Sequence, residues 1–207
     1  MQQPTRQNTK SALIQAAERL FAEKGFGTVS VKDITRAAGA KNPSVVHYHF
    51  GNIETLIKEV FLKRFRKIEA ERRAGLARVD EADAQKRLVA LLEAALTPFI
   101  ATCLEDDGQL YIRFCVQLFT DSRFDRHEII EEAGAESIIL LQNHVIACLD
   151  GIPEDTIERR LRQGFLISLL QADEFSRQVM DGTAPPLKQI VREYAGSLAG
   201  YLSAAVD

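Results

Sequence analysis

The sequence predicts an all-α protein, and three observations support this fold class. Apolar residues recur at spacings of three and four along most of the 207 residues, which is the period of a helix with one buried face. Gly, Pro or Asn, which commonly begin or end helices, stand at the breaks between these segments. No segment has the alternation of a β-strand, and there is no internal repeat or low-complexity tract.

Composition limits the class of protein. The 46% hydrophobic and 27% charged residues are ordinary for a globular chain. No run of about 18 apolar residues is present, so we expect no membrane-spanning segment, and the first ten residues, MQQPTRQNTK, lack an apolar signal segment. Cys103, Cys115 and Cys148 have no metal-ligand spacing, which favours reduced thiols in a cytoplasmic protein.

Charge is unevenly distributed along the chain. Residues 1–78 carry 15 Lys and Arg against 7 Asp and Glu, a net charge of +8, whereas residues 79–207 carry 11 against 22, a net charge of −11. A basic segment favours a polyanionic partner, and an acidic segment repels one. The alternative is an uneven surface charge without a polyanionic partner.

Each of the first two predicted helices is ended by a glycine. The first is expected at residues 8–24, where Gly25 ends it. The second begins at Ser30, which stands three residues before Asp33 as in a capping box, and it ends at Gly39 after about two turns.

The third predicted helix follows the turn that begins at Gly39. Asn42 is its expected N-cap, Pro43 suits its first turn, and Val46 and Phe50 point inward. Two short helices around a glycine turn are the helix-turn-helix pattern, whose second helix enters the major groove of DNA. The outward face has no Arg or Lys; it carries Ser44, Val45, His47 and Tyr48.

Six further helices are predicted after Gly51 and Asn52. The helix at 53–78 has a basic outer face, which is either solvated or attracts DNA over long range. Pro98 is expected to kink the helix at 84–104 or to end its regular part. The segment 110–119 is apolar nearly all round and therefore central. The remaining helices are expected at 125–149, 154–180 and 187–206.

Three segments resemble the N-terminal region of the TetR family of transcriptional regulators. They are SALIQAAERLFAEKGF, TVSVKDITRAAG and NPSVVHYHFGNIETLI, and the resemblance covers roughly residues 9–60. The resemblance implies an N-terminal three-helix DNA-binding domain, followed by a helical-bundle domain for effector binding and dimerisation. We expect these domains at 1–52 and 53–207, with helix 53–78 connecting them. Ile53 departs from the family pattern, in which a Lys is common.

The resemblance further implies a homodimer that binds a palindromic operator in double-stranded DNA, and a small-molecule effector that releases it. His49 adjoins the inward Phe50 and is the most structural member of the expected DNA-contact set. That set consists of Thr28, Ser30, Lys32, Lys41, Asn42, Pro43, Ser44, Val45, His47, Tyr48 and His49.

The best sequence indication of an effector site is Arg113, which shares a helix face with Gln117 in the apolar segment 110–119. A buried arginine needs a partner, either an acidic ligand or an internal carboxylate such as Glu105 or Glu136. Apart from Arg113 and Gln117, each candidate is either a pocket-lining residue or an ordinary core residue. The effector-pocket candidates are Phe99, Cys103, Tyr111, Arg113, Phe114, Gln117, His144 and Gln171.

For the dimer, the resemblance implies a four-helix bundle built from helices 154–180 and 187–206 of each subunit. Small residues on these helices allow close helix packing, either between subunits or within one subunit. The expected interface residues are Leu161, Gly164, Phe165, Ser168, Ala172, Ala195, Leu198, Ala199 and Leu202.

These features predict a ligand-responsive transcriptional regulator, most often a repressor in this family. The alternative is a dimeric helical interaction protein that has lost DNA binding, which the departure at Ile53 leaves open. An enzyme is not expected, since no nucleophile–base pair, glycine-rich phosphate loop or paired carboxylates at a useful spacing stand out. We expect no catalytic residues, no metal, no cofactor and no membrane partner.

Overall fold

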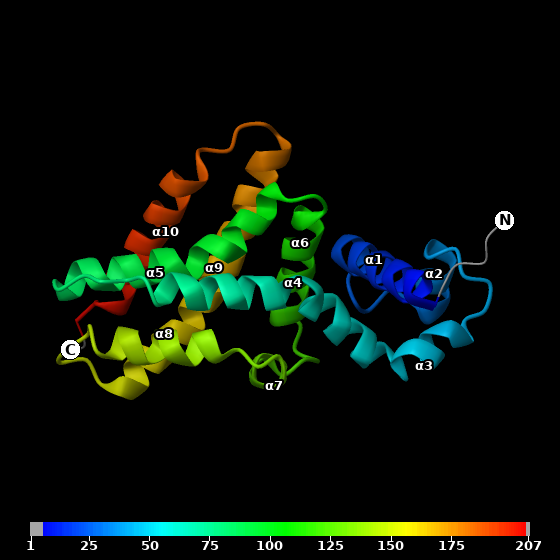
Figure 1. The fold of residues 1–207 in the computed structure, drawn as a ribbon, viewed down its shortest axis with the longest axis horizontal. Helices are drawn as coiled ribbons and strands as arrows, with labels where there is room; N and C mark the ends of the chain where they lie inside the picture. The colour runs from blue at the N-terminus through cyan, green and yellow to red at the C-terminus, as the bar shows by residue number, and fades with distance from the viewer. Residues whose placement is uncertain (1–5, 206–207) are drawn as a thin grey trace.

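The computed structural model describes residues 6–205 and is all-helical there, with ten α-helices, one short 3₁₀-helix and no strand (Figure 1). The predicted fold class is therefore confirmed. Expectations for residues 1–5, where the first domain was expected to begin, and for residue 206, the expected end of the last helix, lie outside the described residues.

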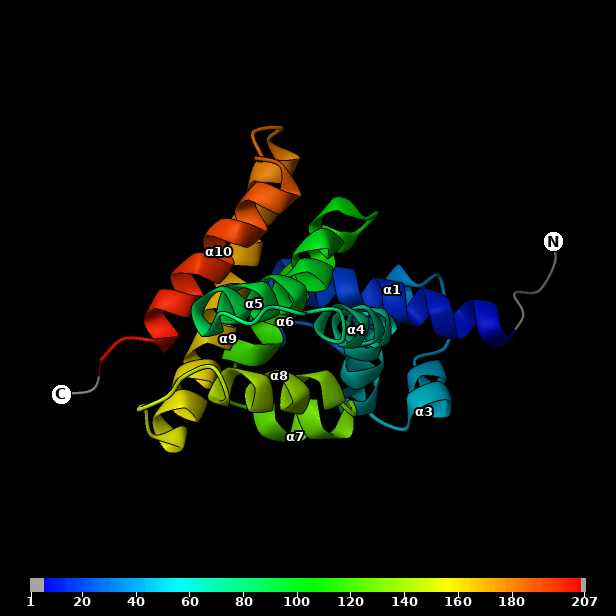
Figure 2. The same cartoon turned by 60° about the vertical axis from the view of Figure 1, so that its left-hand side comes forward.

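Helices α1 (Arg6–Lys24), α2 (Val31–Ala37) and α3 (Ser44–Phe50) form a small bundle at one end of the molecule (Figures 1 and 2). The capping box at Ser30 and Asp33 is present at the start of α2. Gly39 has a φ of 69°, a left-handed conformation that glycine adopts at little cost. The apolar core of the bundle includes Leu13, Ala17, Phe21, Ile34, Val46 and Phe50.

Helix α4 (Ile53–Leu76) leaves this bundle and runs along the remaining helices (Figure 1). Its first turn is capped by Asn52, whose Oδ1 accepts a hydrogen bond from the backbone N–H of Thr55 at 2.8 Å. One face of α4 is buried, and most of its buried residues share one apolar cluster with α1–α3 and α6. The buried residues are Leu56, Ile57, Val60, Phe61, Phe65, Ile68 and Leu76.

The rest of the chain forms a helical bundle around α6 (Gly108–Thr120) and α5 (Ala84–Ala101). Helix α5 packs on α4 and on α10 (Leu187–Leu202), and α6 lies between α1 and α9 (Glu154–Met180). Helix α5 continues through Pro98 to Ala101 and then tightens into the 3₁₀ segment Thr102–Leu104. Of the two expectations for Pro98, a kink or an end of the regular part, the second does not hold, because the α-helix continues three residues beyond it.

The helix predicted at 125–149 is two helices, α7 (Arg126–Glu132) and α8 (Glu136–Ile146). Gly134, with a φ of 68°, separates them and lets the chain change direction. Apolar periodicity on both sides of this glycine made the segment resemble one continuous helix, although a glycine in the left-handed conformation ends a helix.

One segment, Ala84–Leu104, is long and apolar enough to cross a membrane by length and composition. Charged residues near its start, Lys86 and Arg87, interrupt its apolar run. In the fold it is a core helix, and its buried residues Leu88, Leu92, Leu96 and Ile100 share a cluster with α10. A core helix of a helical bundle has this composition without a membrane.

Candidate nucleic-acid interface

Helix α3 offers a side-chain surface that the protein core does not use. The helix buries Val46 and Phe50, and its other side chains are exposed or half-buried. Of the eleven predicted DNA-contact residues, Val45 and His49 are half-buried. The other nine are exposed, namely Thr28, Ser30, Lys32, Lys41, Asn42, Pro43, Ser44, His47 and Tyr48.

Two aromatic rings stand on the outer face of α3. Tyr48 is 60% exposed, and its ring meets that of His49 edge-on at 5.1 Å between centroids. His47 Nδ1 lies 2.5 Å from the carbonyl oxygen of Gly51. This contact requires the proton on Nδ1, which leaves Nε2 of a neutral ring as the acceptor. His47 is therefore oriented by the end of its own helix.

The hydroxyls and amide of the predicted set hold the turns together. Thr28 Oγ1 donates to the carbonyl of Lys24 at 2.7 Å, and Ser30 Oγ donates to Asp33 Oδ2 at 2.6 Å. Hydrogen bonds from the Ser30 side chain and backbone lower the pKa of Asp33. Asn42 Oδ1 accepts from the backbone N–H of Ser44 at 2.9 Å, so it serves as a cap one residue outside Pro43, which occupies the N-cap position.

The α3 helix is held against α1 and α4. Lys10 on α1 donates to Glu59 on α4 at 3.1 Å, and its Nζ lies 5.5 Å from the centroid of the Phe50 ring. The aliphatic stem and ammonium of Lys10 thus span the junction of α1, α3 and α4. Helix α3 needs such a support, because seven residues make only a marginal helix alone.

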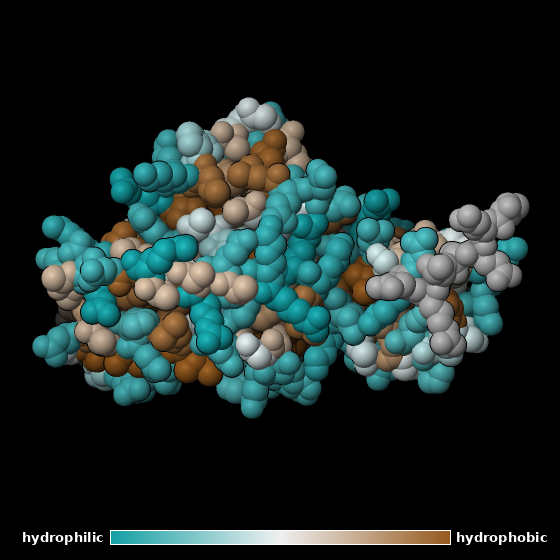
Figure 3. Space-filling model, viewed as in Figure 1, coloured by the Kyte–Doolittle hydropathy of each residue, from teal (hydrophilic) through white to brown (hydrophobic). Residues whose placement is uncertain are grey.

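The basic residues of α4 are tied to acidic residues of other elements, and Figure 3 shows a mostly hydrophilic surface along this helix. Lys63 pairs with the buried Glu18 of α1 at 2.6 Å, and Arg64 pairs with Glu105 at 2.7 Å. Further pairs are Lys58 with Glu132, Lys67 with Glu105, and Arg73 with Glu136. Much of the positive charge of residues 1–78 is therefore neutralised within the chain, which the sequence alone did not reveal.

The predicted effector residues do not gather around one cavity. Tyr111 is fully buried, and its hydroxyl donates to the carbonyl of Phe61 at 2.9 Å. Phe114 is packed against Phe21 and Phe26, with centroids 6.4 and 5.6 Å away. Cys103 Sγ donates to the carbonyl of Ala172 at 3.4 Å. These side chains fill the core.

Phe99, His144 and Gln171 are each half-buried, on α5, α8 and α9 respectively. Phe99 packs against both apolar clusters, and the Gln171 carbonyl accepts a hydrogen bond from Tyr194 at 3.1 Å. They come from three different helices and share no hollow with Arg113.

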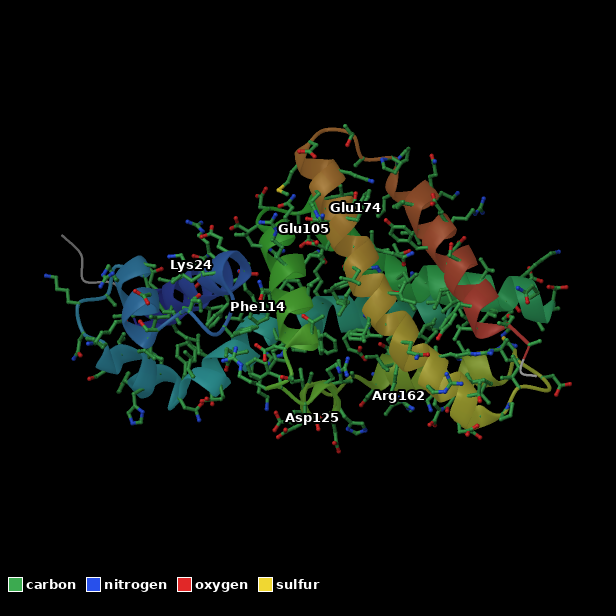
Figure 4. The ribbon with its side chains drawn as sticks, turned by 180° about the vertical axis from the view of Figure 1, so that it is seen from behind. Lys24, Glu105, Phe114, Asp125, Arg162 and Glu174 are labelled. Carbon is green, nitrogen blue, oxygen red and sulfur yellow. The ribbon has the colours of Figure 1, made fainter. Side chains whose placement is uncertain are left out.

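The prediction of a buried Arg113 was wrong, because this side chain is exposed. The two suggested internal partners are engaged elsewhere, Glu105 with Arg64 and Lys67, and Glu136 with Arg73. Arg113 and Gln117 line an open hollow between α1, α6 and α9. Figure 4 shows this side of the molecule, where Lys24 at the end of α1 lies beside α6, and α9, which carries Glu174, crosses α6.

Seven of the nine residues expected at the dimer interface are buried within the single chain. Ala172, Ala195 and Leu202 are fully buried, and a Cβ on Gly164 would lie 2.5 Å from Leu198 Cδ1. Ser168, Leu198 and Ala199 are also buried, whereas Leu161 and Phe165 are half-buried. The small residues thus bring α9 and α10 together within the subunit. The outward apolar residues of α9 instead include Ile167 and Leu170, which are 42% and 56% exposed, and Met180 at the end of the helix.

Within residues 6–205, no group of three or more His, Cys, Asp or Glu side chains is placed to hold a metal ion. The candidate site is a surface of polar and aromatic side chains on α2, α3 and their flanking turns, joined to the remaining helices by α4.

Residues 13–60 match the family model described as bacterial regulatory proteins, tetR family. No curated protein sequence matches the chain. Among solved structures, a TetR-family regulator from Shewanella sp. PV-4 is similar at 19% identity and a TM-score of 0.64, covering 92% of this chain and 95% of its own.

Two further solved structures are similar over nearly their whole length. NalD, the secondary repressor of the MexAB-OprM multidrug efflux pump in Pseudomonas aeruginosa, has 23% identity and a TM-score of 0.60, covering 93% of this chain and 96% of its own. The fatty acid degradation regulator FadR from Bacillus halodurans has 18% identity and a TM-score of 0.60, covering 92% of this chain and 97% of its own.

Proposed function

Because the chain belongs to the TetR family by its N-terminal domain and has the fold of TetR-family regulators, we propose that it is a ligand-responsive transcriptional repressor. In this proposal a cytoplasmic homodimer binds a palindromic operator, and a small-molecule effector releases it. Residues 1–52 contact the DNA, and residues 53–207 bind the effector and form the dimer.

The observation that carries the proposal is the outer face of α3. The helix buries only Val46 and Phe50, and Tyr48 is 60% exposed, so most of its side-chain surface is open to a partner. Side chains of this kind suit the major groove. Ser and Asn exchange hydrogen bonds with base edges, Val contacts a thymine methyl group, and Tyr and His reach bases or phosphates.

Lys32 and Lys41 are exposed near this face and supply phosphate contacts in the proposed complex. Since the lysines and arginines of α4 are largely paired within the chain, the number of phosphate contacts per subunit is small. The repressor therefore depends on two subunits whose α3 helices are about one DNA turn apart, roughly 34 Å.

The effector acts in this proposal by favouring a conformer with a different α3 spacing. Its differential affinity for the two conformers sets the size of the response. NalD is described as the repressor of a multidrug efflux pump and FadR as a regulator of fatty acid degradation. Their small-molecule contexts are compatible with an effector for this chain and do not identify it.

The test is operator binding by fluorescence anisotropy, with DNA from the promoter region of the protein's own gene. A variant with both His47→Ala and Tyr48→Ala should bind at least about tenfold more weakly, with an unchanged helical circular dichroism spectrum, because both side chains are exposed. The matched control is His127→Ala on α7, an exposed histidine far along the chain, which should leave affinity unchanged. Equal affinity of the double variant and the wild type would contradict the proposal.

Salt dependence separates DNA binding from the alternative of an interaction protein that no longer binds DNA. The logarithm of the association constant should fall linearly with the logarithm of salt concentration, by about 0.9 for each phosphate contacted. Replacing Lys41 with Gln should reduce this slope by about 1 per subunit. A slope near zero would favour the interaction protein.

A further inference from the structure

The hollow beside Arg113 joins three helices that lie far apart in the sequence. It has a volume of about 340 Å³, at the lower end of the range for small-molecule sites. The C-terminal end of α1, the outer face of α6 and the side of α9 form its walls. The lining residues are Ala22, Glu23, Arg113, Val116, Gln117, Thr120 and Asp173.

Three charged side chains line this hollow without neutralising one another. Asp173 pairs with Arg177 on its own helix at 2.5 Å. Within residues 6–205, neither Arg113 nor Glu23 forms an ion pair within 4.0 Å, although one is cationic and the other anionic. The two charges are thus held apart on α6 and α1, with space between them.

This charge arrangement selects the chemical class of a ligand. A simple anion would form an ion pair with Arg113 but would be repelled by the carboxylates of Glu23 and Asp173. A simple cation would be repelled by Arg113 on the same wall. A dipolar molecule with a carboxylate for Arg113 and an ammonium group for the two acids meets both signs correctly. Gln117 and Thr120 add hydrogen-bonding groups to the same walls.

The hollow also touches the turn that leads into the DNA-binding helices. Gln117 lies against Gly25, where an added Cβ would be 3.2 Å from Oε1, so the amide is in contact with the end of α1. Thr28, from the same turn, donates to the carbonyl of Lys24 at 2.7 Å. A ligand between Glu23, Arg113 and Asp173 would therefore link the α1 end to α6 and α9, next to the turn that sets the start of α2.

We propose that this hollow binds a small zwitterion, of the size of a free amino acid, and that its occupancy fixes the orientation of α1–α3. The regulatory half of this inference rests on the proposed DNA-binding function, whereas the binding half does not. The site lies at the junction of the DNA-binding bundle with α6 and α9, outside the aromatic core around Tyr111 and Phe114.

Isothermal titration calorimetry on the full chain without DNA tests the binding half. The probes are the standard amino acids and the straight-chain ω-amino acids from β-alanine to ε-aminocaproate, with butyrate and butylamine as single-charge comparisons. At least one zwitterion should bind, and Arg113→Met and Glu23→Gln should each weaken its binding about two- to fivefold, as expected for exposed charge pairs. Arg126→Met, an exposed arginine on α7, is the matched control and should bind like the wild type.

Two results would overturn the binding half: no heat with any zwitterion, or equal affinity in wild type and Arg113→Met. Because Arg113 and Glu23 are exposed, both variants should keep the wild-type melting temperature, and this measurement separates loss of the site from loss of the fold.

The regulatory half is tested by adding the same zwitterion to the protein–operator complex. It should weaken operator affinity about fivefold or more for the wild type and leave Arg113→Met unaffected. If the zwitterion binds but operator affinity is the same in its presence, the regulatory half is wrong. If the protein binds no operator at all, the proposed function fails. The calorimetric measurement still tests zwitterion binding, because it does not involve DNA.

Discussion

Glu69 on α4 accepts two hydrogen bonds from Ser137 at the start of α8, one from the backbone N–H and one from the hydroxyl, both at 2.6 Å. Arg72 extends this contact, because its Nη1 lies 3.3 Å from Ser137 Oγ and its Nε donates to the carbonyl of Ala95 on α5 at 3.1 Å. Burial lowers the pKa of Arg72. One polar cluster thus joins α4, α5 and α8.

Ser137→Ala should destabilise the protein by about 1–2 kcal/mol. The hydroxyl is fully buried, and its removal takes a donor from the Glu69 carboxylate and an acceptor from Arg72, both little exposed. Urea unfolding followed by circular dichroism measures this change. Ser197→Ala on the exposed face of α10 is the control and should change stability by less than about 0.5 kcal/mol. Equal stability of the two variants would show that the cluster contributes nothing.

Gly108→Ala should destabilise the protein by about 3 kcal/mol or more. A Cβ at this position would lie 1.7 Å from the carbonyl oxygen of Thr102, and that backbone belongs to the packed 3₁₀ segment before α6. Thermal unfolding gives the shift. The control is Gly27→Ala, where no atom lies within 4 Å of the added Cβ, and a change there as large as at Gly108 would contradict the steric explanation.

The helical fold was predictable because local signals specify it. The capping box at Ser30 and the N-cap at Asn52 were readable from residue types, and both are present. The break at Gly134 was missed, because apolar periodicity continues on both sides and the left-handed conformation is a property of the fold. The helix predicted at 84–104 does pass through Pro98, and its regular part reaches Ala101, since tertiary packing outweighs the lost backbone hydrogen bond.

The surroundings of the candidate sites were less predictable. The exposed side chains of α3 follow from helical geometry once Val46 and Phe50 are placed inward. Arg113 was expected inside because its segment is apolar, yet helices α1 and α9 leave one strip of α6 uncovered, and Arg113 lies on it. Which strip a neighbouring helix covers depends on contacts between distant segments, such as that of Gln117 with Gly25.

Cys103 and Cys115 should resist alkylation in the native protein at neutral pH. Burial raises the pKa of Cys103 from its ordinary value to about 12 and raises that of Cys115 further. The reactive thiolate of Cys103 is therefore about a thousandfold rarer than for a free cysteine. Mass spectrometry after brief iodoacetamide treatment should show modification mainly at the half-buried Cys148, and all three after unfolding in urea.

The raised thiol pKa values also set a direction for stability against pH. The folded protein favours the protonated thiols, so their contribution is complete below the ordinary thiol pKa near 9 and is lost as pH rises toward about 12. Native alkylation of Cys103 as fast as that of Cys148 at neutral pH would contradict this account.

Leu170→Arg should convert the proposed homodimer to a monomer. Leu170 and Ile167 are 56% and 42% exposed and stand three residues apart on α9, so they share an outward face on a helix that the family resemblance places at the subunit contact. A charge placed on such a face is desolvated without a partner when the subunits meet. Sedimentation velocity should show a dissociation constant at least about tenfold higher than for the wild type.

The same variant should keep its fold, because Leu170 contributes little to the core, and it should bind the operator more weakly, because two α3 helices no longer act together. Ile139→Arg on α8, where the isoleucine is 64% exposed, tests whether the subunits meet through α8 instead of α9. If Ile139→Arg dissociates the dimer and Leu170→Arg does not, the subunits meet through α8, and the spacing of the two α3 helices is set by α8 and its junction with α4 at Glu69 and Ser137.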